Sequence, residues 1–114
     1  MLIEEIRNAI RNNIPVEYSA HCQKRMSERG ILRQDILNCI NTGIIIEDYP
    51  VNDNNNSFKS LPCCLILGST VISNNPIHIV VGFNGYRILI ISACYPDRNV
   101  WLEDNRTRRK KDHV

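Results

Sequence analysis

The chain has 114 residues, of which 43% are hydrophobic and 23% charged, and it carries a net charge of +2. This composition is typical of one globular domain with a single core, and no apolar run is long enough to cross a bilayer, which argues against a membrane partner. The N-terminus lacks the basic start and long apolar stretch of a signal peptide. The five cysteines are odd in number and have no disulfide-framework spacing, so we expect reduced, mostly buried thiols in a cytoplasmic protein.

Three helices are predicted in the first part of the chain. Leu2–Asn12 has apolar residues at helical spacing and is the first of them. Val16–Tyr18 is expected to be a brief extended link to a second helix at Ser19–Gly30, where Ser19 suits the N-cap and Gly30 the position after the last turn. Ile31–Thr42 is the third, and Leu32 makes its start poorly capped.

The apolar period changes after Gly43 and favours strands. Four are expected, at Ile44–Tyr49, Leu61–Gly68, Ile77–Phe83 and Tyr86–Tyr95. The dipeptide Asn84-Gly85 between the last two is the strongest short-range signal of a hairpin. The sequence therefore predicts an α+β domain over residues 1–104, in which three N-terminal helices pack on a curved four-stranded antiparallel sheet.

The charge is distributed unevenly along the chain. Residues 105–114 hold five cations and one aspartate, so this segment carries +4 and the remainder −2. We expect the segment to be a disordered basic tail that serves electrostatics only, and its removal to leave the thermal stability nearly unchanged. Trp101, just before it, is expected to pack back onto the domain.

The predicted helix at Ser19–Gly30 carries the strongest chemical signal. Residues four apart lie on one helix face, so His21, Arg25 and Arg29 form a stripe with Lys24 beside it. An imidazole among fixed cations can hold a phosphate and move a proton. The helix macrodipole at this first turn disfavours the imidazolium and leaves the neutral form, which acts as a general base.

Each of these residues also has an ordinary structural interpretation. His21 could be a surface or capping histidine, and the arginines could form salt bridges. The candidate carboxylate partners are Glu28, Asp35 and Asp48. A metal site is not expected, because Cys63-Cys64 is vicinal on a strand and the chain has no C-x-x-C pair.

Several motifs together resemble domain-of-unknown-function family 4258, from about Tyr18 to Trp101. They are His21…Arg25-Met-Ser-Glu-Arg29-Gly-Ile31, Asp35-Ile36, Thr42-Gly43, Glu47-Asp-Tyr49, Pro76-Ile-His78-Ile-Val80, Tyr95-Pro-Asp97 and Trp101. Leu32 departs from the small hydroxyl residue usual in the family. Family members are similar to RelE-type toxins, within the barnase–EndoU–colicin–RelE group of metal-independent ribonucleases, and some are encoded beside a zinc-finger antitoxin.

This resemblance implies a RelE-like fold, a toxin-like endoribonuclease without a cofactor or metal, and RNA and an antitoxin protein as partners. His21 would take the proton from an RNA 2′-OH, and Arg25 and Arg29 would clamp the scissile phosphate. His78 and Tyr95 are second-rank catalytic candidates. Three further residues are candidates for RNA contact: Lys24, Arg98 and Tyr49.

Four of these side chains, namely those of His78, Tyr95, Tyr49 and Arg98, also have ordinary structural interpretations. A histidine in an apolar strand such as His78 is more often a core residue, and Tyr95 and Tyr49 at strand ends often pack. Arg98 is equally consistent with a solvated side chain.

A competing hypothesis is a non-catalytic module that uses the same His/Arg face to bind nucleic acid or an antitoxin. A third hypothesis is an inactive toxin relative that only docks its partner. Acid–base cleavage needs a second proton-transfer group near His21, or one group with strong charge stabilisation. A separation of more than about 10 Å between the candidate groups would favour the binding module.

Overall fold

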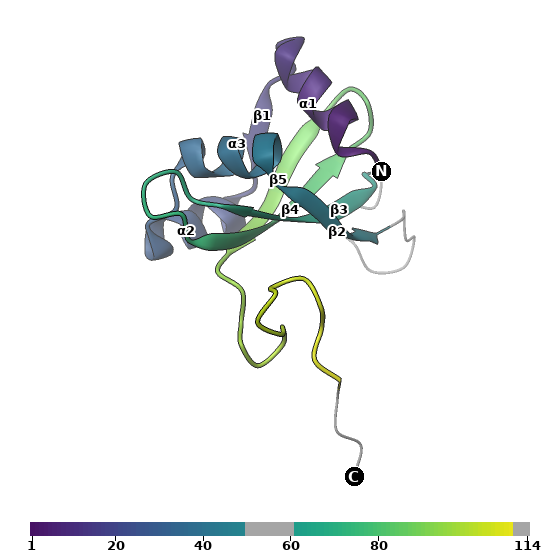
Figure 1. Cartoon of the computed structure of the whole chain (residues 1–114). Helices are drawn as coiled ribbons and strands as arrows, with labels where there is room; N and C mark the ends of the chain where they lie inside the picture. Colours follow the sequence, from purple (N-terminus) through teal and green to yellow (C-terminus); the bar gives the residue numbers. More distant parts are fainter. Residues whose placement is uncertain (50–60, 111–114) are drawn as a thin grey trace.

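The computed structural model describes residues 1–49 and 61–110, which form three helices and one five-stranded sheet (Figure 1). The elements in chain order are α1 (Ile3–Arg11), β1 (Val16–Tyr18), α2 (Ala20–Arg29), α3 (Arg33–Thr42), β2 (Ile44–Tyr49), β3 (Cys63–Ser69), β4 (Pro76–Phe83) and β5 (Ile88–Cys94). The chain is therefore α+β, as predicted, and its helices and long strands lie where the apolar periods placed them.

The sheet differs from the predicted four-stranded antiparallel meander. Its strand order is β1-β5-β4-β3-β2, and β1 pairs with β5 in parallel, with Val16 opposite Ile88 and Tyr18 opposite Ile90. The expectation that Val16–Tyr18 is only a link was wrong. Three residues are too few to reveal a period of two, and the strand's partner lies near the other end of the chain.

The predicted hairpin at Asn84-Gly85 is confirmed. The side-chain oxygen of Asn84 accepts hydrogen bonds from the backbone N–H groups of Tyr86 and Arg87, both at 2.9 Å. Gly85 has φ of +94°, a conformation that favours glycine. The strands β4 and β5 then pair in antiparallel register from Phe83 opposite Ile88 onwards.

The helices pack against one face of the sheet. Side chains alternate along β4, so Ile77, Ile79 and Val81 join the core beneath the helices, together with Cys22 and Met26 of α2. We call the opposite face the outer face. It carries His78 on β4, and its apolar side chains on β3 include Leu65.

A C-terminal hairpin, Val100–Arg109, covers part of the outer face (Figure 1). Its two arms are joined by hydrogen bonds from Leu102 N to Thr107 O (2.8 Å) and from Arg109 N to Val100 O (2.7 Å). Trp101 is 5% exposed, so the expectation that it packs back onto the domain is confirmed.

For residues 105–110 the structure therefore differs from the disordered tail predicted from the sequence. The backbone of Asn105 contacts His78, and Arg108 makes an ion pair with Glu47 of β2. In the sequence, the run of cations has no apolar partner nearby. The surface on which it packs is formed by strands that are distant along the chain. Residues 111–114 lie outside the described residues, as do residues 50–60.

Four of the five cysteines are buried, as expected, and none forms a disulfide. Burial raises the pKa of the Cys39 and Cys64 thiols to about 12, so both remain protonated at neutral pH. Within the described ranges, no helix is both long and apolar enough to span a membrane.

Candidate functional site

Helix α2 is fixed at both ends by the groups that the sequence indicated. The Ser19 hydroxyl oxygen accepts from the backbone N–H of Cys22 (3.0 Å), and the same hydroxyl donates to the carbonyl of Ile91 on β5 (2.9 Å). Gly30 ends the helix in the left-handed conformation, with φ of +67°. Ser19 therefore caps the helix and ties its first turn to the sheet.

The predicted stripe on α2 lies beside the buried seam formed by Cys22 and Met26. His21 is exposed, and across residues 1–49 and 61–110 its side chain makes no hydrogen bond or ion pair. With a rise of 1.5 Å per residue, His21, Arg25 and Arg29 are spaced about 6 Å apart along the axis. The imidazole is thus accessible to a ligand, with a guanidinium one turn away.

The two arginines differ in what they contact. Arg25 forms an ion pair with Glu28 on the same helix (3.0 Å), and the two side chains are 40% and 46% exposed. Arg29 donates to the carbonyl of Ala93 on β5 (3.3 Å). Lys24 is exposed on the outward side of α2. Arg25 is therefore paired with a side chain of its own helix, whereas Arg29 is bonded to the backbone of β5.

Tyr95 lies where α2 ends. Its hydroxyl donates to the backbone carbonyl of Arg29 (3.1 Å), and the residue is 39% exposed. The structure thus brings Tyr95 to Arg29. The axial rise from His21 to Arg29 is about 12 Å, so the Tyr95 hydroxyl is not beside the imidazole.

His78 lies on the outer face, away from the α2 stripe. It is 2% exposed, and its ring packs edge-on against Trp101 with centroids 4.7 Å apart. Its Nε2 lies 2.6 Å from the carbonyl oxygen of Asn105, which can only accept, so Nε2 carries the proton. Burial lowers the pKa of His78, against the opposing effects of the Asn105 carbonyl and Glu47. His78 has the environment of a neutral core histidine.

Tyr49 belongs to a second charged cluster that the sequence analysis missed. Glu47 accepts from Arg108 at 2.6 and 2.8 Å and also from the Tyr49 hydroxyl. The hydrogen bond from Arg108 lowers the pKa of Glu47, and burial beside that carboxylate raises the pKa of Tyr49 to about 12. Alternation along β2 puts Glu47 and Tyr49 on one face, but nothing in the sequence links them to Arg108.

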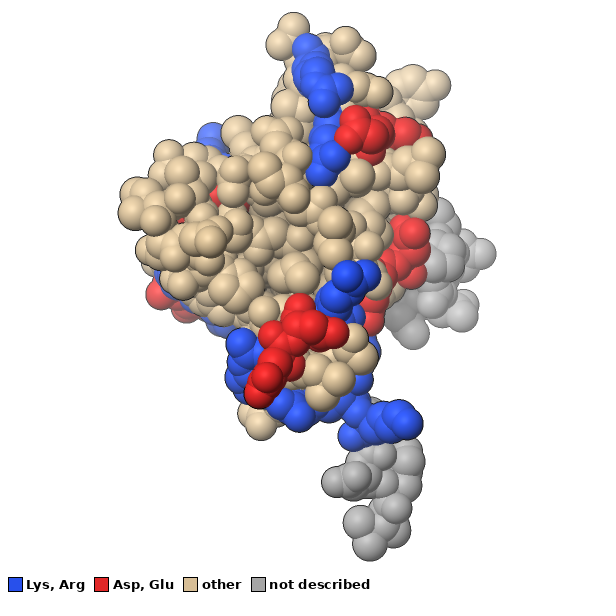
Figure 2. Space-filling model, viewed as in Figure 1, with Lys and Arg blue, Asp and Glu red and all other residues tan. Residues whose placement is uncertain are grey.

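The cationic C-terminal hairpin is balanced by nearby acids. The guanidinium of Arg108 also lies 4.6 Å from the centroid of the Trp101 ring. The Arg98 guanidinium donates to the carbonyl of Leu102 (3.3 Å), and the backbone carbonyl of Arg98 accepts from the Arg109 guanidinium (2.6 Å). Figure 2 shows lysine, arginine and acidic side chains intermixed over this segment. The hairpin is therefore held to the domain by these contacts, and its surface is not uniformly basic.

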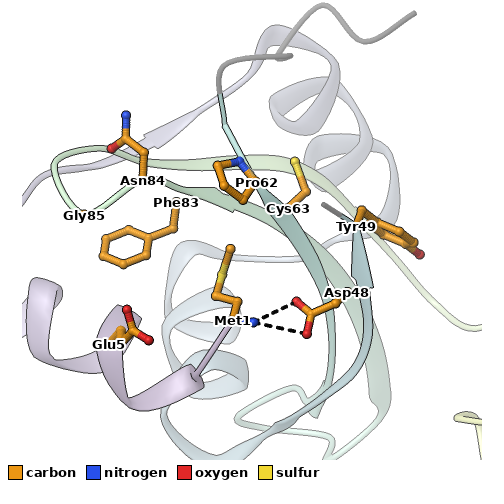
Figure 3. Close-up of a pocket in the computed structure, with 9 residues that line it drawn as sticks. All are labelled: Met1, Glu5, Asp48, Tyr49, Pro62, Cys63, Phe83, Asn84 and Gly85. Atoms are coloured by element: carbon orange, nitrogen blue, oxygen red, sulfur yellow. Dashed lines mark hydrogen bonds and ion pairs between the residues drawn. The ribbon is translucent and has the colours of Figure 1, made fainter. Parts of the chain in front are cut away.

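A cavity of about 700 Å³ lies at the end of the sheet where Asn84 and Gly85 connect β4 to β5 (Figure 3). Phe83 and Pro62 are among its apolar lining residues, and Glu5 and Asp48 add two carboxylates. The Met1 amine is 3.2 Å from Asp48. Of the predicted site residues, only Tyr49 lines it. Over the described part of the chain, no three His, Cys, Asp or Glu side chains are grouped to hold a metal ion.

Comparison with known proteins gives one match. No curated protein and no solved structure matched the chain. A family model described as a domain of unknown function (DUF4258) matches residues 18–95, a span that begins in β1 and ends at Tyr95. The match includes α2 and its stripe, whereas α1 and the C-terminal hairpin lie outside it. The chain belongs to the DUF4258 family.

Proposed function

We propose that this protein is a toxin-like, metal-independent endoribonuclease whose active surface is the α2 stripe. The observation that carries the proposal is that α2 presents an unpartnered, exposed imidazole at its first turn, with Arg25 and Arg29 following in phase. A general base beside fixed cations suits the cleavage of a phosphodiester. The resemblance to RelE-type toxins supports the same reaction class.

The chemistry needs no metal ion. His21 accepts the proton of a 2′-OH, and the 2′-oxygen forms a bond to the adjacent phosphorus. The bond from phosphorus to the 5′-oxygen of the next nucleotide breaks, and the leaving 5′-oxygen takes a proton from solvent water. The products are a 2′,3′-cyclic phosphate and a 5′-hydroxyl end. Arg25 stabilises the charge that develops on the phosphate oxygens. Its ion pair with Glu28 is exposed and contributes only about 0–1 kcal/mol, so a phosphate can replace the carboxylate.

A second candidate function is RNA binding without cleavage. It is favoured by the absence of a second proton-transfer group beside His21 among the candidates. His78 is buried on the outer face, and Tyr95 contacts α2 only at its last turn, about 12 Å along the axis. Cleavage therefore relies on His21 with charge stabilisation, whereas binding needs the cations alone. In both cases an antitoxin that covers the stripe would block the function.

The test is cleavage of a single-stranded RNA in excess chelator, with a 2′-deoxy substitution at the cut site as the substrate control. His21→Ala should lower the rate by about 10²–10⁴-fold and leave RNA affinity largely intact, because a general base has been removed. Arg25→Ala should weaken both binding and cleavage. Ser27→Ala is the matched control, because Ser27 is an exposed residue of α2 that lies on the other side of the buried seam from the stripe.

The outcomes separate the two functions. Unchanged cleavage by His21→Ala would remove His21 from the mechanism. Cleavage that needs a metal ion, or that persists on the deoxy substrate, would reject the mechanism itself. Retained binding with no cleavage of any RNA would establish the non-catalytic module.

A further inference from the structure

A second, smaller cavity of about 160 Å³ opens where α2, α3, the β3–β4 connection and the end of β5 meet. Its lining residues include Gly30 and Tyr95, the buried Asp35 and Thr70, and the exposed Gln34 and Asn75. Drug-sized ligands occupy cavities of about 300–1,000 Å³. At about 160 Å³, this cavity is smaller than that range, which limits its occupant to a small group such as one heterocyclic base.

The walls of the cavity are held in place by internal hydrogen bonds. Asp35 is 4% exposed, and its carboxylate accepts from the backbone N–H groups of Leu32 and Val71, both at 2.8 Å. Thr70 N donates to Asn75 O, and Asn75 N donates to the Thr70 hydroxyl, both at 2.9 Å. The cavity is therefore formed without a ligand, and a ligand would not have to order it.

The groups around the opening suit an unpaired nucleobase. Tyr95 offers a partly exposed ring whose orientation is fixed by its hydrogen bond to the Arg29 carbonyl. The side-chain amides of Gln34 and Asn75 make no hydrogen bond with any described residue, and each offers a donor and an acceptor. RNA bases outside a duplex are recognised by aromatic stacking together with hydrogen bonds to their edges.

The position of the cavity connects it to the α2 stripe. Gly30 lines the cavity and directly follows Arg29, so the cavity lies beside the last turn of α2, and a nucleotide whose base entered it would have its phosphate near that turn. The phosphate of the neighbouring nucleotide would then lie toward Arg25, one helical turn from Arg29. We propose that this cavity binds one unpaired nucleobase of the RNA whose backbone follows α2. This inference rests on the proposed function, because it names how that surface selects its substrate.

The experiment measures affinity by fluorescence anisotropy with 2′-O-methyl hexanucleotides, which cannot undergo 2′-OH attack. The four homopolymers are compared with an abasic hexamer of the same backbone. We expect at least one base-bearing hexamer to bind about tenfold or more tightly than the abasic one, as stacking one base on an aromatic ring predicts. Tyr95→Ala and Gln34→Ala should each reduce this ratio, whereas Asn41→Ala, an exposed amide on the same helix outside the cavity, should not.

A second measurement separates this inference from the proposed function. Addition of a nucleoside 5′-monophosphate should shift the NMR signals of the Gln34 and Asn75 side-chain amides. Equal affinity for base-bearing and abasic hexamers, with both weakened by Arg25→Ala, would overturn the nucleobase site and leave RNA binding standing. Amide shifts without binding of any hexamer would show a site for a free nucleotide and would overturn both the RNA function and the binding of an RNA base in this cavity. No amide shift and no base preference would reject the cavity as a site.

Discussion

The contact between Trp101 and the outer face makes a strong prediction about stability. Trp101 is 5% exposed, and its ring centroid lies 4.7 Å from that of His78. The central guanidinium carbon of Arg108 lies 4.6 Å from the centroid of the Trp101 ring. Replacing a buried tryptophan by alanine typically costs about 3–5 kcal/mol, and the lost cation–π contact adds about 0.5–1 kcal/mol. Since domains of this size are stable by about 5–15 kcal/mol, Trp101→Ala should remove a large fraction of the total.

Thermal unfolding followed by circular dichroism checks this prediction. The melting temperature of Trp101→Ala should fall by roughly 10–20 °C, given the usual sensitivity of small domains to a loss of this size. Tyr86→Ala is the matched control, because Tyr86 is an aromatic residue that is 89% exposed and should change the melting temperature little. Truncation after Asp104, which removes Asn105 and Arg108, should act in the same direction as Trp101→Ala. If both changes left the melting temperature within about 2 °C of wild type, the hairpin would not pack as described.

Two further predictions concern pH and packing. Burial lowers the pKa of His78, so near pH 6.5 the unfolded chain takes up a proton that the folded chain does not bind. The free energy of unfolding should therefore fall as the pH drops below about 6.5. His78→Gln should flatten this pH dependence, as measured by urea titrations. A steep pH dependence in His78→Gln would assign the effect to another group. Gly68→Ala should destabilise the fold by about 1–3 kcal/mol, because the new methyl group would lie 2.6 Å from the Cys39 sulfur and 2.7 Å from its Cα. Gly82→Ala, whose methyl group would meet only side chains at 3.3 Å or more, is the comparison, and equal losses in the two variants would contradict the close approach of α3 to β3.

Local signals in the sequence predicted the elements well, and long-range contacts account for the differences. Ser19, Gly30 and Asn84-Gly85 act through neighbouring backbone groups, so their caps and turn could be predicted from a few residues. The pairing of Val16–Tyr18 with β5 depends on a partner near the far end of the chain. A run of three residues does not reveal it.

The same distinction separates the two histidines. His21 lies on a helix whose period could be determined from the sequence, so its exposure and its spacing to Arg25 were predictable. Alternation along β4 predicted that His78 points away from Ile77 and Ile79, but not what covers it. The cover is supplied by Trp101 and Asn105, which reach it through a hairpin stabilised by Arg108 and Glu47. Opposite charges 61 residues apart carry no pairing signal in one sequence.

The extent of the family match bears on which surface is functional. The matched span, residues 18–95, contains the α2 stripe, Tyr95 and every residue that lines the smaller cavity. The hairpin that buries His78 lies beyond it. An activity that belongs to the family must reside in the matched domain, and within that domain α2 and the end of β5 supply an exposed imidazole, two arginines and a preformed cavity. His78 is neutral and covered, so its part in the molecule is to support the outer face, while the chemistry proposed for this protein depends on α2.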